Sequence, residues 1–191
     1  MNPRFLLWLL SLFVAGHASF AHTPPRTGQE KPAPAAQNPA APAANPKDVE
    51  SLDAIVAAVY DVISGPAGER DWHRFRSLFV ADGRLIAVIK QPDGAFGSRF
   101  LTVDDYAHGA GEYFRKTAFY EREVARKTEQ FGQIAHVFTT YESRNAPDAK
   151  PFQRGINSMQ FFNDGKRWWC VTIYWDSERE GNPLPDRYLN K

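Results

Sequence analysis

Residues 153–176 read QRGINSMQFFNDGKRWWCVTIYWD, and they carry the strongest fold signal in the chain. An Asn-Asp-Gly-Lys turn at 163–166 separates two runs that are rich in aromatic and β-branched side chains. Asp-Gly supplies the positive-φ backbone positions that a tight hairpin turn needs. The stretch therefore predicts two long antiparallel strands, 153–163 and 167–176, joined by a two-residue turn.

Both faces of this predicted hairpin carry large apolar side chains. With a two-residue turn, the faces are Ile156, Ser158, Gln160, Phe162, Trp169, Val171, Ile173 and Trp175 on one side, and Asn157, Met159, Phe161, Trp168, Cys170, Thr172 and Tyr174 on the other. An antiparallel sheet with one face in water normally alternates apolar and polar residues. We therefore expect helices to cover one face and a second copy of the chain to cover the other, as a homodimer formed through the sheet.

Upstream of the hairpin, the spacing of apolar residues changes from helical to alternating near residue 118. Alternation over 119–129 and 133–144 predicts two more strands. The apolar run LIAVI at 85–89 predicts a buried strand, which lies between turns at 81–83 and 91–94.

Three helices are predicted before residue 118. Apolar residues recur at helical spacing over 49–63, where Asp48 is the expected N-cap, and Asp71 is the expected cap of a second, short helix. The sequence 102–105, Thr-Val-Asp-Asp, is a capping box for the third. Its inward residues are expected to be Tyr106, Ala110, Tyr113 and Phe114. Helices first and long strands later indicate an α+β fold, with three helices packed on one face of a curved antiparallel sheet.

The first residues indicate export rather than folded structure. Arg4 precedes the apolar run FLLWLLSLFVA at 5–15, which is shorter than the roughly 20 residues needed to span a membrane. The small-x-small pattern of Ser19-Phe20-Ala21, or alternatively of Gly16-His17-Ala18, fits a cleavage site. We therefore predict a signal peptide over 1–21 and a bacterial protein that is periplasmic or secreted, with no stable membrane anchor after cleavage. An uncleaved N-terminal anchor is the alternative.

Residues 22–47 have a different composition from the rest of the chain. They contain seven prolines, seven alanines and no large apolar side chain. Such a segment buries too little surface to offset its chain entropy. The sequence thus predicts a disordered Pro/Ala-rich tether over 22–47, followed by one domain over 48–191.

Charge and residue types exclude several classes of function. The formal net charge of the chain is +1, and no basic run is present, which argues against a nucleic-acid binder. One cysteine and five histidines without metal-ligand spacing predict no metal site. No phosphate loop, dinucleotide fingerprint or Gly-x-Ser-x-Gly elbow is present, so no cofactor is expected.

The chain resembles the nuclear-transport-factor-2-like superfamily, also called SnoaL-like or cystatin-like. The motifs that carry the resemblance are DWHRFRSLF at 71–79, DGRL at 82–85 and the final hairpin. The segments FGQIAHVFTTYESR at 131–144, GINSMQ at 155–160 and WWCVTIYW at 168–175 look like an exported bacterial branch. The resemblance covers about residues 49–180. It implies a cone-shaped sheet with a cavity between sheet and helices, and it leaves the function open because this fold hosts both enzymes and binding proteins.

Enzymes that resemble this fold aim an aspartate or histidine into the cavity. His136 is the candidate catalytic residue, because it lies in an otherwise apolar strand beside Ile134 and Phe138. Desolvation there would lower its pKa and keep it neutral, as a general base requires. The alternative is a hydrogen-bonded structural or interface histidine.

Seven further residues are candidate ligand contacts: Trp72, Tyr106, Tyr113, Tyr141, Arg144, Asn157 and Trp169. The aromatic ones are suited to the wall of an apolar pocket, although aromatic stripes are more often core. Arg144 or Arg154 is suited to bind a substrate carboxylate through two hydrogen bonds, unless each forms a structural salt bridge.

Two functions agree with these features. The first is an exported, non-catalytic, homodimeric domain that binds a small apolar or mildly acidic molecule. The second is a cofactor-free acid–base enzyme, an isomerase, dehydratase or cyclase, with His136 as its base. The sequence contains no clear Asp–His pair, and this favours the first.

Overall fold

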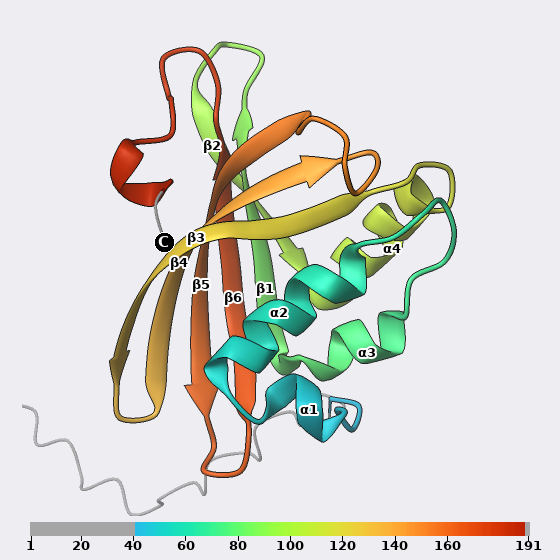
Figure 1. Cartoon of the computed structure of the whole chain (residues 1–191), viewed down its shortest axis with the longest axis vertical. Coiled ribbons are helices and arrows are strands. Elements are labelled where there is room, and N and C mark those ends of the chain that lie inside the picture. Colours follow the sequence, from blue (N-terminus) through green and yellow to red (C-terminus); the bar gives the residue numbers. More distant parts are fainter. Residues whose placement is uncertain (1–40, 190–191) are drawn as a thin grey trace, which may run out of the picture. The chain divides into compact units, whose positions relative to one another are not determined.

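A computed structural model describes residues 41–189 as a six-stranded sheet with helices on one side (Figure 1). The predicted signal peptide and most of the predicted tether lie outside the described residues. The strands are β1 (Phe79–Lys90), β2 (Phe96–Thr102), β3 (Tyr120–Phe131), β4 (Ile134–Arg144), β5 (Gln153–Asn163) and β6 (Trp168–Ser177). The helices are α1 (Pro46–Val49), α2 (Leu52–Ile63), α3 (Trp72–Ser77), α4 (Val103–Phe114) and the 3₁₀-helix η1 (Asp186–Tyr188).

The predicted α+β class is confirmed, but the sheet is mixed rather than wholly antiparallel. Its strand order is β2-β1-β6-β5-β4-β3, and β1 runs parallel to β6, with Leu85 opposite Ile173. Hairpin connections make neighbouring strands antiparallel within the β1–β2 pair and within the β3–β6 group. The segment that contains α4 joins the pair to the group, and it sets the parallel orientation of β1 and β6. Strand β2 was not predicted at all, because most of its side chains are exposed and it lacks an apolar alternation.

The predicted first helix is two helices. Asn45 caps α1 and Ser51 caps α2, whose first turn donates the Ala54 N–H to the Ser51 hydroxyl oxygen at 3.1 Å. Asp48 was expected to be a cap. Instead it accepts hydrogen bonds from the Arg74 guanidinium at 2.8 and 3.0 Å, which ties α1 to α3.

The caps of the other two helices agree with the sequence prediction. Asp71 accepts a hydrogen bond from the Arg74 backbone N–H at 2.8 Å, and Thr102 and Asp105 form the capping box of α4. The turn predicted at 81–83 is instead an irregularity within β1, where the pairing with β6 shifts between Phe79 and Arg84.

The final hairpin has a longer connection than predicted and contains a β-bulge. Asn163 pairs with Trp168, so residues 164–167 form the loop, and Val171 is an extra residue in β6. Beyond Val171 the alternation reverses, so Ile173 and Trp175 share a face with Met159 and Asn157. The predicted faces are therefore correct near the loop and wrong beyond the bulge.

The helices cover one face of the sheet, here called the inner face (Figure 1). The buried core lies between them, and its largest fully buried side chains include Phe75, Phe79, Phe161 and Met159. The opposite, outer face carries exposed aromatic residues, and η1 packs on part of it. There the Thr140 hydroxyl donates to the Tyr188 carbonyl oxygen, and the Tyr188 ring lies 5.1 Å from that of Phe138.

Candidate functional site

A cavity of about 150 Å³ lies between the inner face of the sheet and the helices. Its wall is largely aliphatic and aromatic. Five of the lining side chains carry polar groups, and the Trp175 indole adds a sixth. The lining residues are Val59, Ile63, Phe75, Leu85, Tyr106, Phe119, Glu121, Tyr141, Gln153, Asn157, Met159, Ile173 and Trp175. Gln153 is the exposed member of this set and marks the outer end of the cavity.

Glu121 is the carboxyl group of the cavity, and the end of α2 holds it in place. The Glu121 backbone N–H donates to the Ser64 hydroxyl at 2.9 Å, and that hydroxyl donates to the carbonyl oxygens of Tyr60 and Glu121. Gly65 and Phe119 exchange two backbone hydrogen bonds beside it, at 2.7 and 3.0 Å. The segment after α2 therefore pairs with the start of the edge strand β3, where Glu121 lies.

Burial controls the protonation of Glu121. Desolvation raises its pKa from 4.5 to about 7, because the interior of the protein disfavours the charged form. Hydrogen bonds from Ser143, at 2.8 Å, and from Asn157 partly oppose this rise. Near neutral pH the group is therefore a mixture of carboxylic acid and carboxylate.

Two tyrosines supply neutral hydroxyl groups to the same cavity. Burial raises the pKa of Tyr106, and it raises the pKa of Tyr141 to about 12. The Tyr141 hydroxyl is hydrogen-bonded to Ser177 at 3.0 Å. Both tyrosines therefore keep their protons at physiological pH, and each is able to donate a hydrogen bond.

This arrangement is suited to a small, neutral, mainly apolar molecule with one polar group. A protonated Glu121 donates to a carbonyl oxygen, and an ionised Glu121 accepts from a hydroxyl. No basic side chain is present among the described residues that line the cavity, so a bound anion would have no opposite charge.

Three of the predicted ligand contacts line the cavity. Tyr106, Tyr141 and Asn157 come from α4, β4 and β5, and the tertiary structure brings them together around Glu121. Asn157 is buried, and its amide nitrogen donates to the Tyr60 hydroxyl at 3.1 Å.

His136 lies on the outer face of the sheet, away from this cavity. Its neighbours Ala135 and Val137 are the buried, inward-facing residues of β4. The His136 Nε2 atom is hydrogen-bonded to the Ser158 hydroxyl at 2.9 Å. His136 is therefore not the base of the cavity, because the pleat turns alternate side chains of a strand to opposite faces.

The remaining four predicted contacts also lie outside the cavity lining. Trp72 stacks with Phe114 at 6.2 Å between ring centroids, and Tyr113 is 47% exposed on α4. Arg144 forms a salt bridge with Glu142 at 2.8 Å. Trp169 lies under the Arg167 guanidinium at 3.6 Å from its ring and donates to Asp164.

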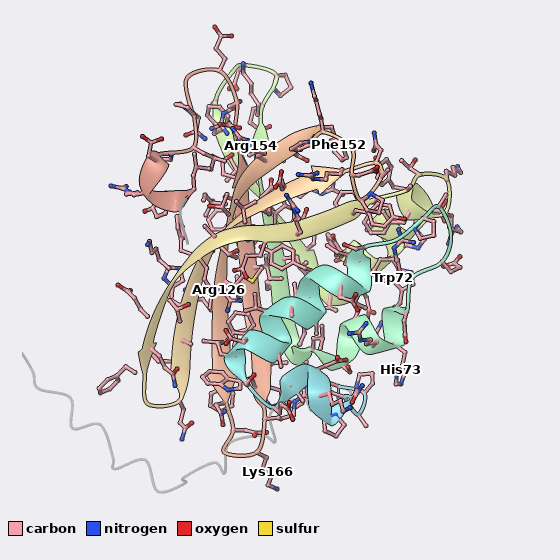
Figure 2. All side chains as sticks on the ribbon, viewed as in Figure 1. Trp72, His73, Arg126, Phe152, Arg154 and Lys166 are labelled. Atoms are coloured by element: carbon pink, nitrogen blue, oxygen red, sulfur yellow. The ribbon has the colours of Figure 1, made fainter. Side chains whose placement is uncertain are left out.

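Arg154, the alternative carboxylate contact, forms a salt bridge with Glu178 at 2.8 Å. Figure 2 shows Arg154 near the start of β5, away from Trp72, which lies beside the helices. Both arginines thus form the structural salt bridges that the sequence analysis left open as the alternative.

Sequence reasoning missed Glu121 because β3 contains a bulge. Near the β3–β4 turn the inward residues of β3 are even-numbered, for example Thr128 opposite Val137. Val124 is an extra residue, so Glu121 and Glu123 face inward instead of their neighbours. The available sequence signal was a pair of acidic residues, Glu121 and Glu123, on either side of Arg122 at the start of a strand rich in charged residues.

Within residues 41–189, no cluster of three histidine, cysteine, aspartate or glutamate side chains is arranged to hold a metal ion. No helix in that range is long and apolar enough to cross a membrane.

Solved structures with the same architecture exist, although their sequences are distant. A protein with a cystatin-like fold from Nostoc punctiforme is 11% identical, with a TM-score of 0.51, and the match covers 66% of this chain and 88% of that one. A cystatin-like protein from Caulobacter vibrioides is 12% identical, with a TM-score of 0.51 and coverage of 69% and 90%. A Mycobacterium tuberculosis protein is 13% identical, with a TM-score of 0.50 and coverage of 71% and 75%.

The Nostoc and Mycobacterium proteins are of unknown function, and the Caulobacter protein is uncharacterised. No protein-family model and no curated protein matches the sequence. The structural matches therefore establish the fold, and any assignment of function has to come from the site.

Proposed function

We propose that this chain, a domain with the nuclear-transport-factor-2-like or cystatin-like fold, binds a small neutral molecule in the cavity around Glu121. The observation that carries the proposal is one titratable carboxyl group in a mainly apolar cavity. Ligand sites of this kind pair apolar walls with a few polar groups that fix orientation.

The volume of the cavity limits the size of the ligand. An apolar cavity of about 150 Å³ accommodates benzene, so the ligand is one ring or its equivalent in size. The Glu121 carboxyl favours a ligand that also bears a carbonyl or hydroxyl group, because such a group forms a further hydrogen bond with it. A neutral ligand replaces the mildly acidic one that the sequence allowed. Arg144 and Arg154, which were expected to bind a carboxylate, form salt bridges within the protein instead.

Cyclohexanone, phenol and benzoate are suitable probes, with binding followed by NMR chemical shifts of the protein. We expect cyclohexanone to bind more tightly at pH 5.5 than at pH 8.5, since only the carboxylic acid donates to its carbonyl. Benzoate should bind weakly at pH 8.5, where it meets the Glu121 carboxylate. Glu121→Gln should bind cyclohexanone equally at both pH values, because an amide N–H donates at either.

Glu129→Gln is the matched control, because Glu129 lies on the same strand opposite His136 on the outer face. This variant should bind as the unmodified protein does. The proposal fails if neither cyclohexanone nor phenol binds, or if Glu121→Gln keeps the pH dependence.

Acid–base catalysis is a second candidate function, which the pKa of Glu121 favours. A carboxyl with a pKa of about 7 is able to take a proton from carbon and return it near neutral pH. Tyr106 and Tyr141 would then donate hydrogen bonds to the enolate oxygen that forms. Deuterium uptake next to the carbonyl of cyclohexanone in D₂O, lost in Glu121→Gln, would support catalysis. Uptake no faster than in buffer without protein would indicate that the domain binds the ligand but does not catalyse the exchange.

Export is part of the proposal and rests on the sequence of residues 1–21. The apolar run 5–15 and the small residues that follow it support a cleaved signal peptide and a periplasmic or secreted protein. The intact mass of protein recovered outside the cytoplasm of a bacterial host tests this, and a mature chain that still begins at Met1 would contradict it.

Homodimer formation through the outer face is also part of the proposal. Exposed apolar side chains on that face support it: Phe96, Phe100, Ile134, Phe162 and Tyr174. On the predicted face that carries Met159, Phe161, Trp168 and Tyr174, the first three are buried under the helices and Tyr174 is exposed. The patch therefore differs in composition from the predicted one, but it remains an apolar surface for a second copy.

A further inference from the structure

A buried chain of hydrogen bonds runs from the cavity to the protein surface. The Asn157 amide nitrogen donates to the Tyr60 hydroxyl, 3.1 Å away, and that hydroxyl is hydrogen-bonded to Thr139 Oγ1 at 3.1 Å. Thr139 Oγ1 donates to a carboxylate oxygen of Glu123 at 2.9 Å. Asn157, Tyr60 and Thr139 are all buried, with at most 6% of their surface exposed.

The outer end of the chain is an ion pair. The Arg126 guanidinium contacts Glu123 at 2.7 Å and Asp53 of α2 at 2.7 Å. Figure 2 shows Arg126 between the β3 ribbon and α2. Glu123 is thus a carboxylate at the protein surface, and it fixes the direction of every hydrogen bond behind it.

The direction follows from counting hydrogen atoms. A carboxylate only accepts, so Thr139 must donate its one hydroxyl hydrogen to Glu123. Tyr60 must then donate to Thr139, which leaves the Tyr60 oxygen as an acceptor. Asn157 must therefore present its amide nitrogen, and not its carbonyl oxygen, to Tyr60.

We infer that Glu123, Thr139 and Tyr60 are positioning residues for the cavity, because together they fix the orientation of the Asn157 amide beside Glu121. With the amide nitrogen held in place, its second hydrogen is available to Glu121. The inference rests on the proposed function at one point, namely that Glu121 is the carboxyl group of the binding site.

The groups around Glu121 make this effect measurable. The titratable groups that face it are Tyr60 of α2, Tyr106 of α4 and Tyr141 of β4, and burial raises the pKa of all three. They therefore stay neutral. On its own strand, the adjacent Arg122 pairs with Glu142, and Glu123 pairs with Arg126.

Thr139→Val tests the inference without changing any charge. The variant removes the acceptor of the Tyr60 hydroxyl hydrogen, and Asn157 is then the remaining partner of that hydroxyl. The Tyr60 hydroxyl therefore donates to the Asn157 amide oxygen, which requires the amide group to flip. Glu121 then loses a donor, and its pKa, measured by ¹³C NMR of its carboxyl carbon, should rise by about one unit. Thr139→Ser keeps a hydroxyl at this position and should restore the original value.

Thr140→Val is the matched control. Thr140 is the next residue on β4, equally buried at 1% exposure, and its hydroxyl bonds to Tyr188 on the outer face. This substitution should leave the pKa of Glu121 unchanged even if it lowers the melting temperature.

Tyr60→Phe is the second variant, should Thr139→Val not fold. Removing the hydroxyl lets both amide orientations populate, so the pKa of Glu121 should again rise. If Thr139→Val, or failing it Tyr60→Phe, changes only the melting temperature and leaves this pKa unchanged, the inference is wrong. Because the titration needs no ligand, a negative binding experiment does not affect this result.

Discussion

At the scale of single residues, Glu121 has an unusual environment for a carboxyl group. It lies on an edge strand, yet its side chain points beneath the helices into an apolar cavity. Only Ser143 and Asn157 offer it hydrogen bonds, and these do not offset the loss of water, so its pKa stays near 7. A buried carboxyl without a cationic partner lowers stability at the pH where it ionises. Such groups are therefore candidates for functional sites.

The stability of the protein should depend on pH through Glu121. Its pKa in the folded state, about 7, lies above the unfolded value of 4.5, so the folded state binds the proton more tightly. The contribution is fully present below about pH 4.5 and is lost as pH rises through 7. Over this window the free energy of unfolding should fall by about 3 kcal/mol through this group.

Urea denaturation of the unmodified protein and of Glu121→Gln, at several pH values from 4.5 to 8, measures this contribution. The difference between the two isolates Glu121, since other groups titrate in both proteins. Parallel curves for the two proteins over this range would contradict the prediction.

At the scale of elements, the cavity depends on a close approach between β5, β6 and the Tyr141 side chain. Gly155 makes this approach possible. A Cβ atom at this position would meet the backbone oxygen of Asp176 and lie 2.6 Å from the Tyr141 hydroxyl oxygen. Gly155 lies opposite Tyr141 in the β4–β5 pair, on the inner face. A larger residue would therefore displace a wall of the cavity.

Gly155→Ala should destabilise the protein by about 1–3 kcal/mol, as overpacking in a core usually does. It should also weaken the binding of cyclohexanone, because Tyr141 has to move. Thermal denaturation and the NMR titration described above measure the two effects.

Gly109→Ala is the control of opposite sign. Gly109 lies within α4, and a Cβ atom there has no neighbour within 4 Å. Alanine is the better helix former, so this variant should gain about 0.5–1 kcal/mol. Equal stability of Gly155→Ala and the unmodified protein would show that the close approach is not required.

At the scale of the whole molecule, the two faces of the sheet differ in what covers them. Helices bury the inner face (Figure 1), whereas the outer face keeps Phe162 at 40% and Phe100 at 68% exposure. The C-terminal segment covers the part near Phe138 and Thr140, and the Arg179 guanidinium lies over the Phe96 ring. A face that carries several large exposed apolar side chains is typical of a protein interface.

We predict that the chain is a dimer at micromolar concentration and that Phe162→Glu yields monomers with unchanged secondary structure. A buried charge on an apolar interface is unfavourable, and Phe162 makes no core contact that the fold requires. Light scattering and circular dichroism measure the two properties.

Tyr113→Glu is the control, because Tyr113 is 47% exposed on the helical side of the molecule. It should leave the dimer intact. Trp168 is unsuitable for this test, because it is 7% exposed and belongs to the core, so a glutamate there would destabilise the domain. A monomer mass for the unmodified protein would contradict the prediction and leave the outer face free for a different partner.

Much of the fold could be predicted from the sequence, because its determinants are local. The Thr102 capping box, the Asp71 cap and the bounds of β5 agree with the structure. Caps and alternating strands act over a few residues, so neighbouring side chains suffice to specify them. The α1–α2 break was missed because Asp48, which was expected to be a cap, pairs with Arg74 from another helix.

The α+β class, three of the helices, five of the six strands and the two apolar sheet faces could be predicted from the amino-acid sequence alone. Which side chains line the cavity depends instead on contacts that form in the folded chain. Single extra residues, Val124 in β3 and Val171 in β6, reverse the alternation and turn Glu121 and Trp175 inward. The reason is physical: contacts with distant elements stabilise a bulge, so the position of the bulge leaves no local mark in the sequence.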